Sequence, residues 1–582
     1  MSRSILNNTS IFGTYIAAAA SADPAVTAVD SWPYASQTSV RNMGREVRGN
    51  SEYILSPWGF YHSMTAYFHL GQNITAPMEY AFARRGENQW VTTNLYQALL
   101  HPLYTMYPAD LGDPQVSLDF HDGAGFAGGS GERSFYYISK AMYPDDAMVD
   151  YVYRQATSGQ DRTALTRTIF GQPLQTLTMQ AMAQAKGLGL TKYDPLMGFM
   201  ISKNGWSETD LSMVMNNFTL GAGHYHAQAN SFSLSALGRT WSNSPQYHIV
   251  PNDDQQTVLF QTNPSSTYAS QGYTGQGPGS EDYLNNYQDQ QPFHGAVLQV
   301  SYDPDGQWTW FAGDSAPGYN YEGQGSIKLN QVSTGLTNSY MLPAGLTSVL
   351  IPADATTLTN STQFANALPY NPVQYAFRSI MTVLGTYPYV LVIDDVNRNG
   401  NPQNYRWVMN NSIGFGGSPN LFMDATGKTS YASLEIQAGA TATDATLYHV
   451  LDSGTAAGLP RLLVRDVTAQ LTTGQPAIFI DDRPIPSGGG TSQSNLTYGI
   501  DNNSHNFTYF PTRRLMIERD AVVEPKYKVL LFPYLTGGLM PVTSWNAATS
   551  TLTVQVGTQT DTITVDETNS DHRTRFKSFL RH

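Results

Sequence analysis

The spacing of apolar residues along the chain changes near residue 200. In the N-terminal part, five segments carry apolar residues at intervals of three and four, the period of an amphipathic helix. Gly and Pro residues stand at several of their ends, as expected for helix boundaries. These segments are 4–22, 57–71, 75–104, 132–143 and 174–189. The pattern therefore predicts a helical domain over residues 1–200.

From residue 201 onward, apolar and polar residues alternate, the pattern of half-buried strands. The clearest such segments are 226–238, 255–262, 295–303, 307–313, 339–345, 387–396, 404–410, 445–452, 461–469, 527–535 and 550–566. No helix-length pattern separates successive strands, which argues against a parallel sheet. We therefore expect an α+β multidomain protein whose residues 201–582 form a large antiparallel β-sandwich. That region divides into a central sheet over 201–460 and a smaller C-terminal sheet over 461–582.

Composition narrows the functional classes. The 582 residues contain 32 basic and 45 acidic side chains, a formal net charge of −13, and no cysteine. The negative charge argues against a nucleic-acid partner. The missing cysteines exclude disulfides, thiolate nucleophiles and zinc fingers. No run of about 18 apolar residues occurs, so we expect no membrane-spanning helix.

The N-terminal 22 residues favour an amphipathic helix over a signal peptide, since Asn7, Asn8, Thr9 and Ser10 interrupt the apolar stretch. Low charge together with abundant hydroxyl and amide side chains is nevertheless common in proteins that work outside the cytosol. We expect a secreted, periplasmic or cell-surface protein.

Two glycine-containing motifs have structural explanations. Residues 123–128 (GAGFAG) fit a dinucleotide-binding glycine pattern, but no βαβ unit surrounds them, so a glycine-rich loop is the better interpretation. Residues 395–400 (DVNRNG) resemble the start of a calcium loop, but Arg406 stands where the closing Glu belongs. Strand patterns on both sides favour a hairpin turn here.

The sharpest chemical feature is a pair of histidines, His224 and His226, after the glycine-containing segment 221–223. In a strand, residues two apart face the same side. Both imidazoles would then point together, which suits metal binding, proton transfer or structural hydrogen bonds.

Residues 221–241 (GAGHYHAQANSFSLSALGRTW) resemble the start of the β-domain in heparinase II/III-like polysaccharide lyases. Weaker similarities lie in 118–125 (LDFHDGAG), in the paired strand patterns at 387–410, and in 57–71, which resembles the helix that carries the family's catalytic tyrosine. The resemblance implies an N-terminal α/α toroid followed by antiparallel sheets. Family members carry many more toroid helices before that tyrosine, so it implies an incomplete toroid, through either processing or reduction.

The family eliminates across a uronic acid, which requires neutralising the sugar carboxylate, removing the C5 proton and protonating the O4 leaving group. By resemblance, Asn7 or Asn8 would neutralise the carboxylate. Tyr61 would be the acid, and in an alternative mechanism it would also be the base. His224 would be the base or a partner of the carboxylate. The residues that would bind substrate are His62, Arg239, Trp58 and Gln228.

Some family members hold a structural zinc, for which His226 matches the first ligand. Asn243 and Gln255 occupy the positions of the other two ligands, and neutral amides bind zinc poorly. We therefore expect no cofactor and no zinc, although His248 is a spare ligand.

The expected partner is an acidic polysaccharide, and the net charge favours a sparsely charged uronate polymer such as alginate or glucuronan. Trp58, Trp90 and Trp241 could stack on sugars or belong to the core. Two other functions stay open: a non-catalytic carbohydrate-binding or surface-layer protein on a lyase fold, and a glycoside hydrolase. The hydrolase would need paired carboxylates, for which Asp119, Asp122 and Glu132 are the candidates. The sequence leaves the oligomeric state open.

Overall fold

A computed structural model describes somewhat less than half of the chain. The described residues are 33–34, 38–39, 57–59, 80, 83, 86, 95–105, 134–157, 177–217, 229–242, 257–261, 273–274, 295–320, 373–410, 434–436, 444–449, 452, 454–468, 477–484 and 511–582.

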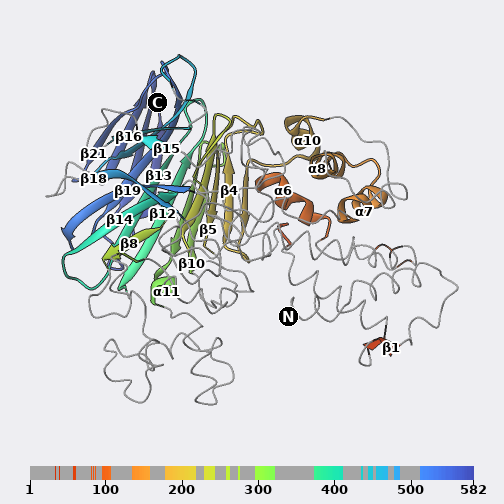
Figure 1. The fold of residues 1–582 in the computed structure, drawn as a ribbon, viewed down its shortest axis with the longest axis horizontal. Coiled ribbons are helices and arrows are strands. Elements are labelled where there is room, and N and C mark those ends of the chain that lie inside the picture. Colours follow the sequence, from red (N-terminus) through yellow and green to blue (C-terminus); the bar gives the residue numbers. More distant parts are fainter. Residues whose placement is uncertain are drawn as a thin grey trace.

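The described N-terminal part contains short helices that pack on one face of a sheet (Figure 1). They are η2 (Gln97–Leu99), α6 (Leu100–Thr105), α7 (Ser134–Met142), α8 (Ala147–Thr157) and α10 (Met179–Lys186). Helix α10 has both expected end signals. The Thr178 hydroxyl accepts from the Ala181 N–H at its start, and Gly187, at φ 61°, ends it in the left-handed conformation.

Helix α8 begins with a side-chain cap that also joins neighbouring segments. The Asp146 carboxylate accepts from the backbone N–H groups of Met148 and Val149. Its other oxygen accepts from the Tyr96 hydroxyl and the Lys186 ammonium, both at 2.7 Å. The end of α10 is thereby tied to the start of α8.

The sheet under the helices, here called the helix-side sheet, has the order β3-β4-β5-β6-β7 and is fully antiparallel. Its strands are β3 (Thr191–Asp194), β4 (Phe199–Lys203), β5 (Ser212–Asn216), β6 (Ser231–Ala236) and β7 (Arg239–Ser242). Phe199 and Ile201 pack against the helices, whereas the intervening Met200 packs on the opposite side. The sheet is therefore covered on both faces.

The central sheet has the order β10-β11-β12-β13-β20-β17-β16-β15, again with antiparallel neighbours. Its strands are β10 (Ala296–Tyr302), β11 (Trp308–Asp314), β12 (Tyr375–Val383), β13 (Tyr389–Asn397), β15 (Leu434–Ile436), β16 (Asp444–His449), β17 (Pro460–Asp466) and β20 (Tyr527–Leu535). A short helix, α11 (Ala316–Asn320), follows β11.

Two further sheets flank the central one, and a separate pair of short strands lies near the N-terminus, β1 (Pro33–Tyr34) with β2 (Thr38–Ser39). The side sheet has the order β18-β19-β14-β8-β9, and the C-terminal sheet runs from β21 to β24 in sequence order. Their strands are β8 (Val258–Gln261), β9 (Tyr273–Thr274), β14 (Gln403–Asn410), β18 (Ala477–Pro484), β19 (Pro511–Val522), β21 (Val542–Asn546), β22 (Thr551–Val556), β23 (Gln559–Asp566) and β24 (Arg575–Arg581).

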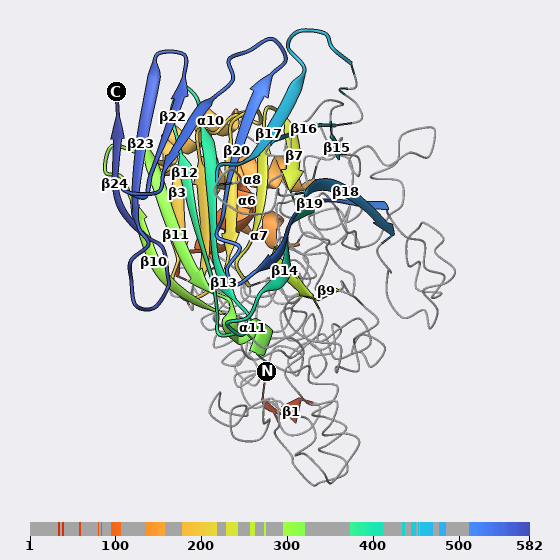
Figure 2. The same cartoon turned by 90° about the vertical axis from the view of Figure 1, so that its left-hand side faces the viewer.

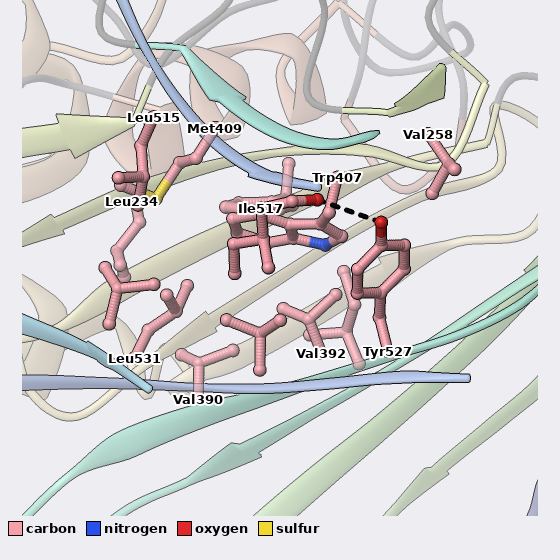
Figure 3. Packing of buried hydrophobic residues seen from close by; sticks show 14 of the residues in the cluster. Leu234, Val258, Val390, Val392, Trp407, Met409, Leu515, Ile517, Tyr527 and Leu531 are labelled. Atoms are coloured by element: carbon pink, nitrogen blue, oxygen red, sulfur yellow. Dashed lines mark hydrogen bonds between the residues drawn. The ribbon is translucent and has the colours of Figure 1, made fainter. Parts of the chain in front are cut away.

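The layers are visible in Figure 1, and Figure 2 shows the C-terminal sheet in front of the central one. One apolar cluster joins the helix-side, central and side sheets, and a second joins the central and C-terminal sheets. In the first cluster Trp407 comes together with Ile517, Tyr527 and Val392 (Figure 3). Alternate residues of β13 enter different clusters, since Leu391 belongs to the second. The central strands are thus buried on both faces.

The predicted antiparallel sheets are confirmed, and the helices at 132–143 and 174–189 lie where expected. In the part of the chain that is described, the helices are few and short, and an α/α toroid is not evident. The first strand of the helix-side sheet begins at Thr191, shortly before the predicted boundary at 200. No helix among these residues is both long and apolar enough to cross a membrane.

The prediction of a hairpin turn at 395–400 is wrong. Strand β13 pairs with β12 and β20, whereas β14 pairs with β19 and β8, so this turn carries the chain from the central sheet into the side sheet. The flanking patterns reported two strands correctly, but alternation does not specify which neighbour a strand takes. Asp395 is also engaged, since its carboxylate accepts from the backbone N–H and hydroxyl of Thr574.

Candidate functional site

Most residues that the sequence nominated lie outside the described part of the chain, so their roles stay predictions. They are Asn7, Asn8, Tyr61, His62, His224, His226, Gln228, Asn243, His248 and Gln255, together with Trp90, the glycine-rich segment 123–128 and the carboxylates Asp119, Asp122 and Glu132. Three other nominated residues, Trp58, Arg239 and Trp241, are described.

Trp58 lies in a turn that is fixed against the helices. A Cβ atom on the following residue, Gly59, would lie 2.4 Å from the carbonyl oxygen of Gln97 and 2.9 Å from the Cβ of Leu100. Glycine is required at this position because φ is 100° and the backbone of η2 is so close. The Trp58 side chain is 38 % exposed, so part of it is open to solvent. A sugar-stacking role remains a prediction.

Arg239, at the start of β7, already has a carboxylate partner. Its Nε and Nη2 atoms donate to the two oxygens of Asp452 at 2.6 and 3.0 Å, and Nη1 donates to the carbonyl oxygen of Gly238. This bidentate pair neutralises the guanidinium, so a uronate would have to compete with Asp452. Two residues along β7, Trp241 is fully buried and its indole N–H donates to the Ala236 carbonyl, which makes Trp241 a core residue.

The attachment points of the segment that carries His224 are described. Strand β5 ends at Asn216 and β6 begins at Ser231, and these two residues are paired in the ladder. The connection between them therefore leaves and re-enters the helix-side sheet at the same end of these two adjacent strands. Asn217 and Asn230 are the residues at its two ends, and both are buried.

Both end residues reach across to the central sheet. The Nδ2 of Asn217 donates to the carbonyl oxygens of Ala296 and Asp314, at 2.7 and 3.4 Å. The Nδ2 of Asn230 donates to the carbonyl oxygen of Gly313 at 3.0 Å. The connection is thus bound at both ends to β10 and to the end of β11.

Arg378 of β12, in the central sheet, binds the backbone at one end of this connection. Its Nη1 donates to the carbonyl oxygen of Asn230 at 3.0 Å, and its Nε and Nη2 bind both oxygens of Asp394 at 2.7 and 3.0 Å. The Trp407 indole N–H also donates to Asp394, at 3.0 Å. Burial raises the pKa of Asp394, and the Arg378 charge opposes that rise. The guanidinium also lies over the Phe232 ring, 5.6 Å from its centroid.

The face of the helix-side sheet that is turned toward the helices is partly polar. Phe232 and Leu234 pack toward the central sheet, so Ser231 and Ser233 of the same strand lie on the opposite face, the one on which Val214 packs against the helices. Hydroxyl groups here, next to the end of β5, provide hydrogen-bond donors and acceptors close to where the His224 segment begins.

The far end of the same face carries a buried ammonium group. Lys203 donates to the Ser212 hydroxyl at 3.1 Å and lies over the Trp206 ring. Burial lowers the pKa of Lys203 to about 8, with Asp210 opposing the change. Within the described residues, no three His, Asp or Glu side chains gather as a metal-binding group.

Heparan sulfate lyase HepC from Pedobacter heparinus aligns with a TM-score of 0.53 and 9 % identity, over 98 % of this chain and 65 % of that one. Heparinase III aligns with a TM-score of 0.51 and 10 % identity, over 100 % of this chain and 69 % of that one. The fold is that of heparinase III. No protein-family model and no curated protein sequence matches the chain.

A second heparinase III structure gives the same result, with a TM-score of 0.52 and 10 % identity over the whole chain and 67 % of its own length. The chain thus spans about two thirds of these heparinase III-like structures. At such identities the likeness establishes the fold and leaves the chemistry to the residues of this chain. The resemblance that the segment 221–241 suggested is confirmed at the level of the fold.

Sequence reasoning missed the residues that hold the His224 connection in place. For Asn230 the sequence offers one signal, an asparagine directly before the strand that begins at Ser231. Asn230 adopts φ 64°, a left-handed conformation that Asn tolerates better than most residues. Arg378 and Asp394 are directly opposite in the β12–β13 ladder. Their pairing would follow from the sequence once the turn between those strands was located. Asn217 gives no comparable signal, because its partners belong to a distant part of the chain.

Proposed function

We propose that the protein is a polysaccharide lyase that cleaves a uronic-acid-containing polymer by β-elimination. The observation that carries this proposal is the agreement with heparinase III-like folds over nearly the whole chain. Further support comes from Asn217 and Asn230, the described residues at either end of the connection that contains His224, which are bound where β5 ends and β6 begins in the sheet on which the helices pack. A fold hosts many chemistries, so the proposal depends equally on the residues that the sequence nominates.

The proposed chemistry assigns one task to each of three side chains. The carboxamide of Asn7 or Asn8 donates to the uronate carboxylate, which lowers the energy of the enolate-like transition state. His224 removes the C5 proton as a base, and Tyr61 protonates O4 as the C4–O4 bond breaks. The electron pair of the C5–H bond becomes the C4=C5 double bond of the product. His62, Arg239, Trp58 and Gln228 are the proposed substrate contacts.

The proposed substrate is a sparsely charged uronate polymer, alginate or glucuronan, acted on outside the cytosol. The net charge of −13 supports this choice, because it repels a polymer with a high density of negative charge. Arg239 supports the same choice, because its charge is already paired with Asp452. The structural relatives are named for heparan sulfate and heparin, so heparan sulfate is the informative comparison substrate. We further propose that the N-terminal helices belong to an α/α toroid and that catalysis needs neither cofactor nor zinc.

The decisive experiment measures unsaturated product. The protein is incubated with alginate, glucuronan and heparan sulfate, and the ultraviolet absorbance of the unsaturated uronate is followed together with new reducing ends. We expect absorbance with a sparsely charged polymer, and its loss in Tyr61→Phe and His224→Ala. Tyr302→Phe is the matched control, because Tyr302 is 62 % exposed on the edge strand β10.

Other outcomes contradict the proposal in distinct ways. New reducing ends without ultraviolet absorbance indicate hydrolysis. Polymer binding without either signal indicates a carbohydrate-binding protein. Full activity in Tyr61→Phe removes the phenol from the mechanism, and activity confined to heparan sulfate removes the argument from net charge.

A further inference from the structure

We propose that Asn217 and Asn230 are positioning residues, whose side-chain amides bind both ends of the connection 218–228 to the central sheet and thereby set the location of His224. The functional role of these two amides rests on the proposed function, because the location of His224 matters for activity only if His224 is catalytic. The binding itself is a property of the described residues.

The two amides reach away from the sheet whose strands they follow and precede. Asn217 follows β5 and Asn230 precedes β6, and both strands belong to the helix-side sheet. Their Nδ2 atoms nevertheless donate to carbonyl oxygens of the central sheet, those of residues 296, 313 and 314 in the β10–β11 ladder. Closing a connection between two paired strands requires no contact with another sheet. The amides therefore fix the ends of the connection relative to the central sheet.

Two glycines leave the space that the two amides occupy. A Cβ atom on Gly313 would lie 2.1 Å from the Asn217 Nδ2 and 2.2 Å from the Asn230 Oδ1. A Cβ atom on Gly295 would lie 1.9 Å from the Asn217 Oδ1. Gly313 in β11 and Gly295, just before β10, thus make room for both carboxamides, which meet over Gly313. The two carboxamides therefore occupy space that a side chain at residue 295 or 313 would need.

The backbone of Asn230 is held by a buried ion pair. The carbonyl oxygen of Asn230 accepts from Arg378, and Arg378 is itself held by Asp394. Both members of this pair are nearly fully buried. Asn230 is further constrained by its left-handed backbone at φ 64°, which a β-branched residue would not adopt without strain. The end of the connection is therefore held through its backbone as well as its side chain.

Hydrogen exchange tests the proposal without any substrate. In Asn230→Gly the left-handed backbone is retained and the amide is removed, and in Asn230→Asp the shape is retained and the donor is lost. We expect exchange of the peptide 218–228 to become about tenfold faster in both variants, the factor for losing one hydrogen bond. Exchange of β4 should stay unchanged. Leu237→Gly is the matched control, because Leu237 has φ 57° at the opposite end of β6.

The kinetic readout separates positioning from general destabilisation. With a substrate polymer, both Asn230 variants should lower kcat about tenfold and leave KM unchanged, since a misplaced base affects the chemical step more than binding. Unchanged exchange of 218–228, or equal acceleration across the whole helix-side sheet, overturns the proposal. If the unaltered protein shows no lyase activity, the proposed function fails, and the exchange experiment still decides whether the amides hold the connection.

Discussion

Replacing Gly313 by alanine tests the packing around the two asparagines directly. The new methyl group would lie 2.1 Å from the Asn217 Nδ2 and 2.2 Å from the Asn230 Oδ1, far inside normal contact. Neither side chain can yield easily, because Asn217 is fully buried and Asn230 is 4 % exposed. At least one amide must therefore leave its carbonyl partner.

The expected loss of stability follows from two terms. Forcing an extra carbon into a packed interior costs about 1–3 kcal/mol. Leaving a buried amide or carbonyl without its partner costs about 1–3 kcal/mol more. We therefore expect Gly313→Ala to lower the free energy of unfolding by roughly 2–6 kcal/mol, or to prevent folding altogether.

The assay is urea unfolding followed by tryptophan fluorescence, because Trp241 of the helix-side sheet and Trp310 of the central sheet are buried in the two sheets that meet at Gly313. The matched control is Gly189→Ala. A Cβ atom on Gly189 would find its nearest neighbour at 3.7 Å, an ordinary contact, and its backbone is not left-handed. The control should unfold at the same urea concentration as the unaltered protein.

Unfolding of Gly313→Ala and Gly189→Ala at the same urea concentration would contradict this prediction. That result would mean that the carboxamides move aside at little cost, and the rigidity invoked for the His224 connection would be lost with it.

Three further predictions concern buried charges. Burial raises the pKa of Asp395 to about 6, against 3.8 in the unfolded chain, so the folded state binds this proton more tightly and stability falls as the pH rises from 4 to 6. Asp395→Asn should remove up to roughly 3 kcal/mol of that pH dependence in urea unfolding at several pH values. Burial lowers the pKa of Lys203 to about 8, against 10.5, so stability rises between those pH values, and Lys203→Met should abolish this rise in the same assay. Arg378→Met leaves Asp394 buried without its partner and should lower the free energy of unfolding by about 3–5 kcal/mol. A double variant that also carries Asp394→Leu should recover much of that loss, and a failure to recover would show that the ion pair does more than neutralise itself.

Local sequence patterns predicted individual elements well where one chemical rule controls them. Helix α10 begins at a threonine cap and ends at Gly187, inside the predicted segment 174–189. The strands β10, β11, β13 and β20 match predicted alternating segments. Strands buried on both faces were harder, because β4 reads FMISK, with no clear alternation, and was not predicted. Strand β12 was also missed, although it pairs along its whole length with β13.

The candidate site divides in the same way. A short histidine motif sufficed to indicate the heparinase II/III-like fold, and the structural comparisons confirm that fold. The residues that anchor the motif were not found, because their partners are distant in the sequence. Asn217 binds Ala296, 79 positions away, and Asn230 binds Gly313, 83 positions away.

The sequence by itself determined where the chain turns from helical to alternating patterns and which residues can cap, turn or be buried, because these depend on the geometry of a few neighbouring residues. The tertiary structure alone decided which strands pair. It placed Val390 beside Leu531, and it sent the turn after Asp395 into another sheet instead of closing a hairpin. The physical reason is that burial and ladder hydrogen bonding can be satisfied by any complementary strand. The choice among them depends on the packing of the whole chain.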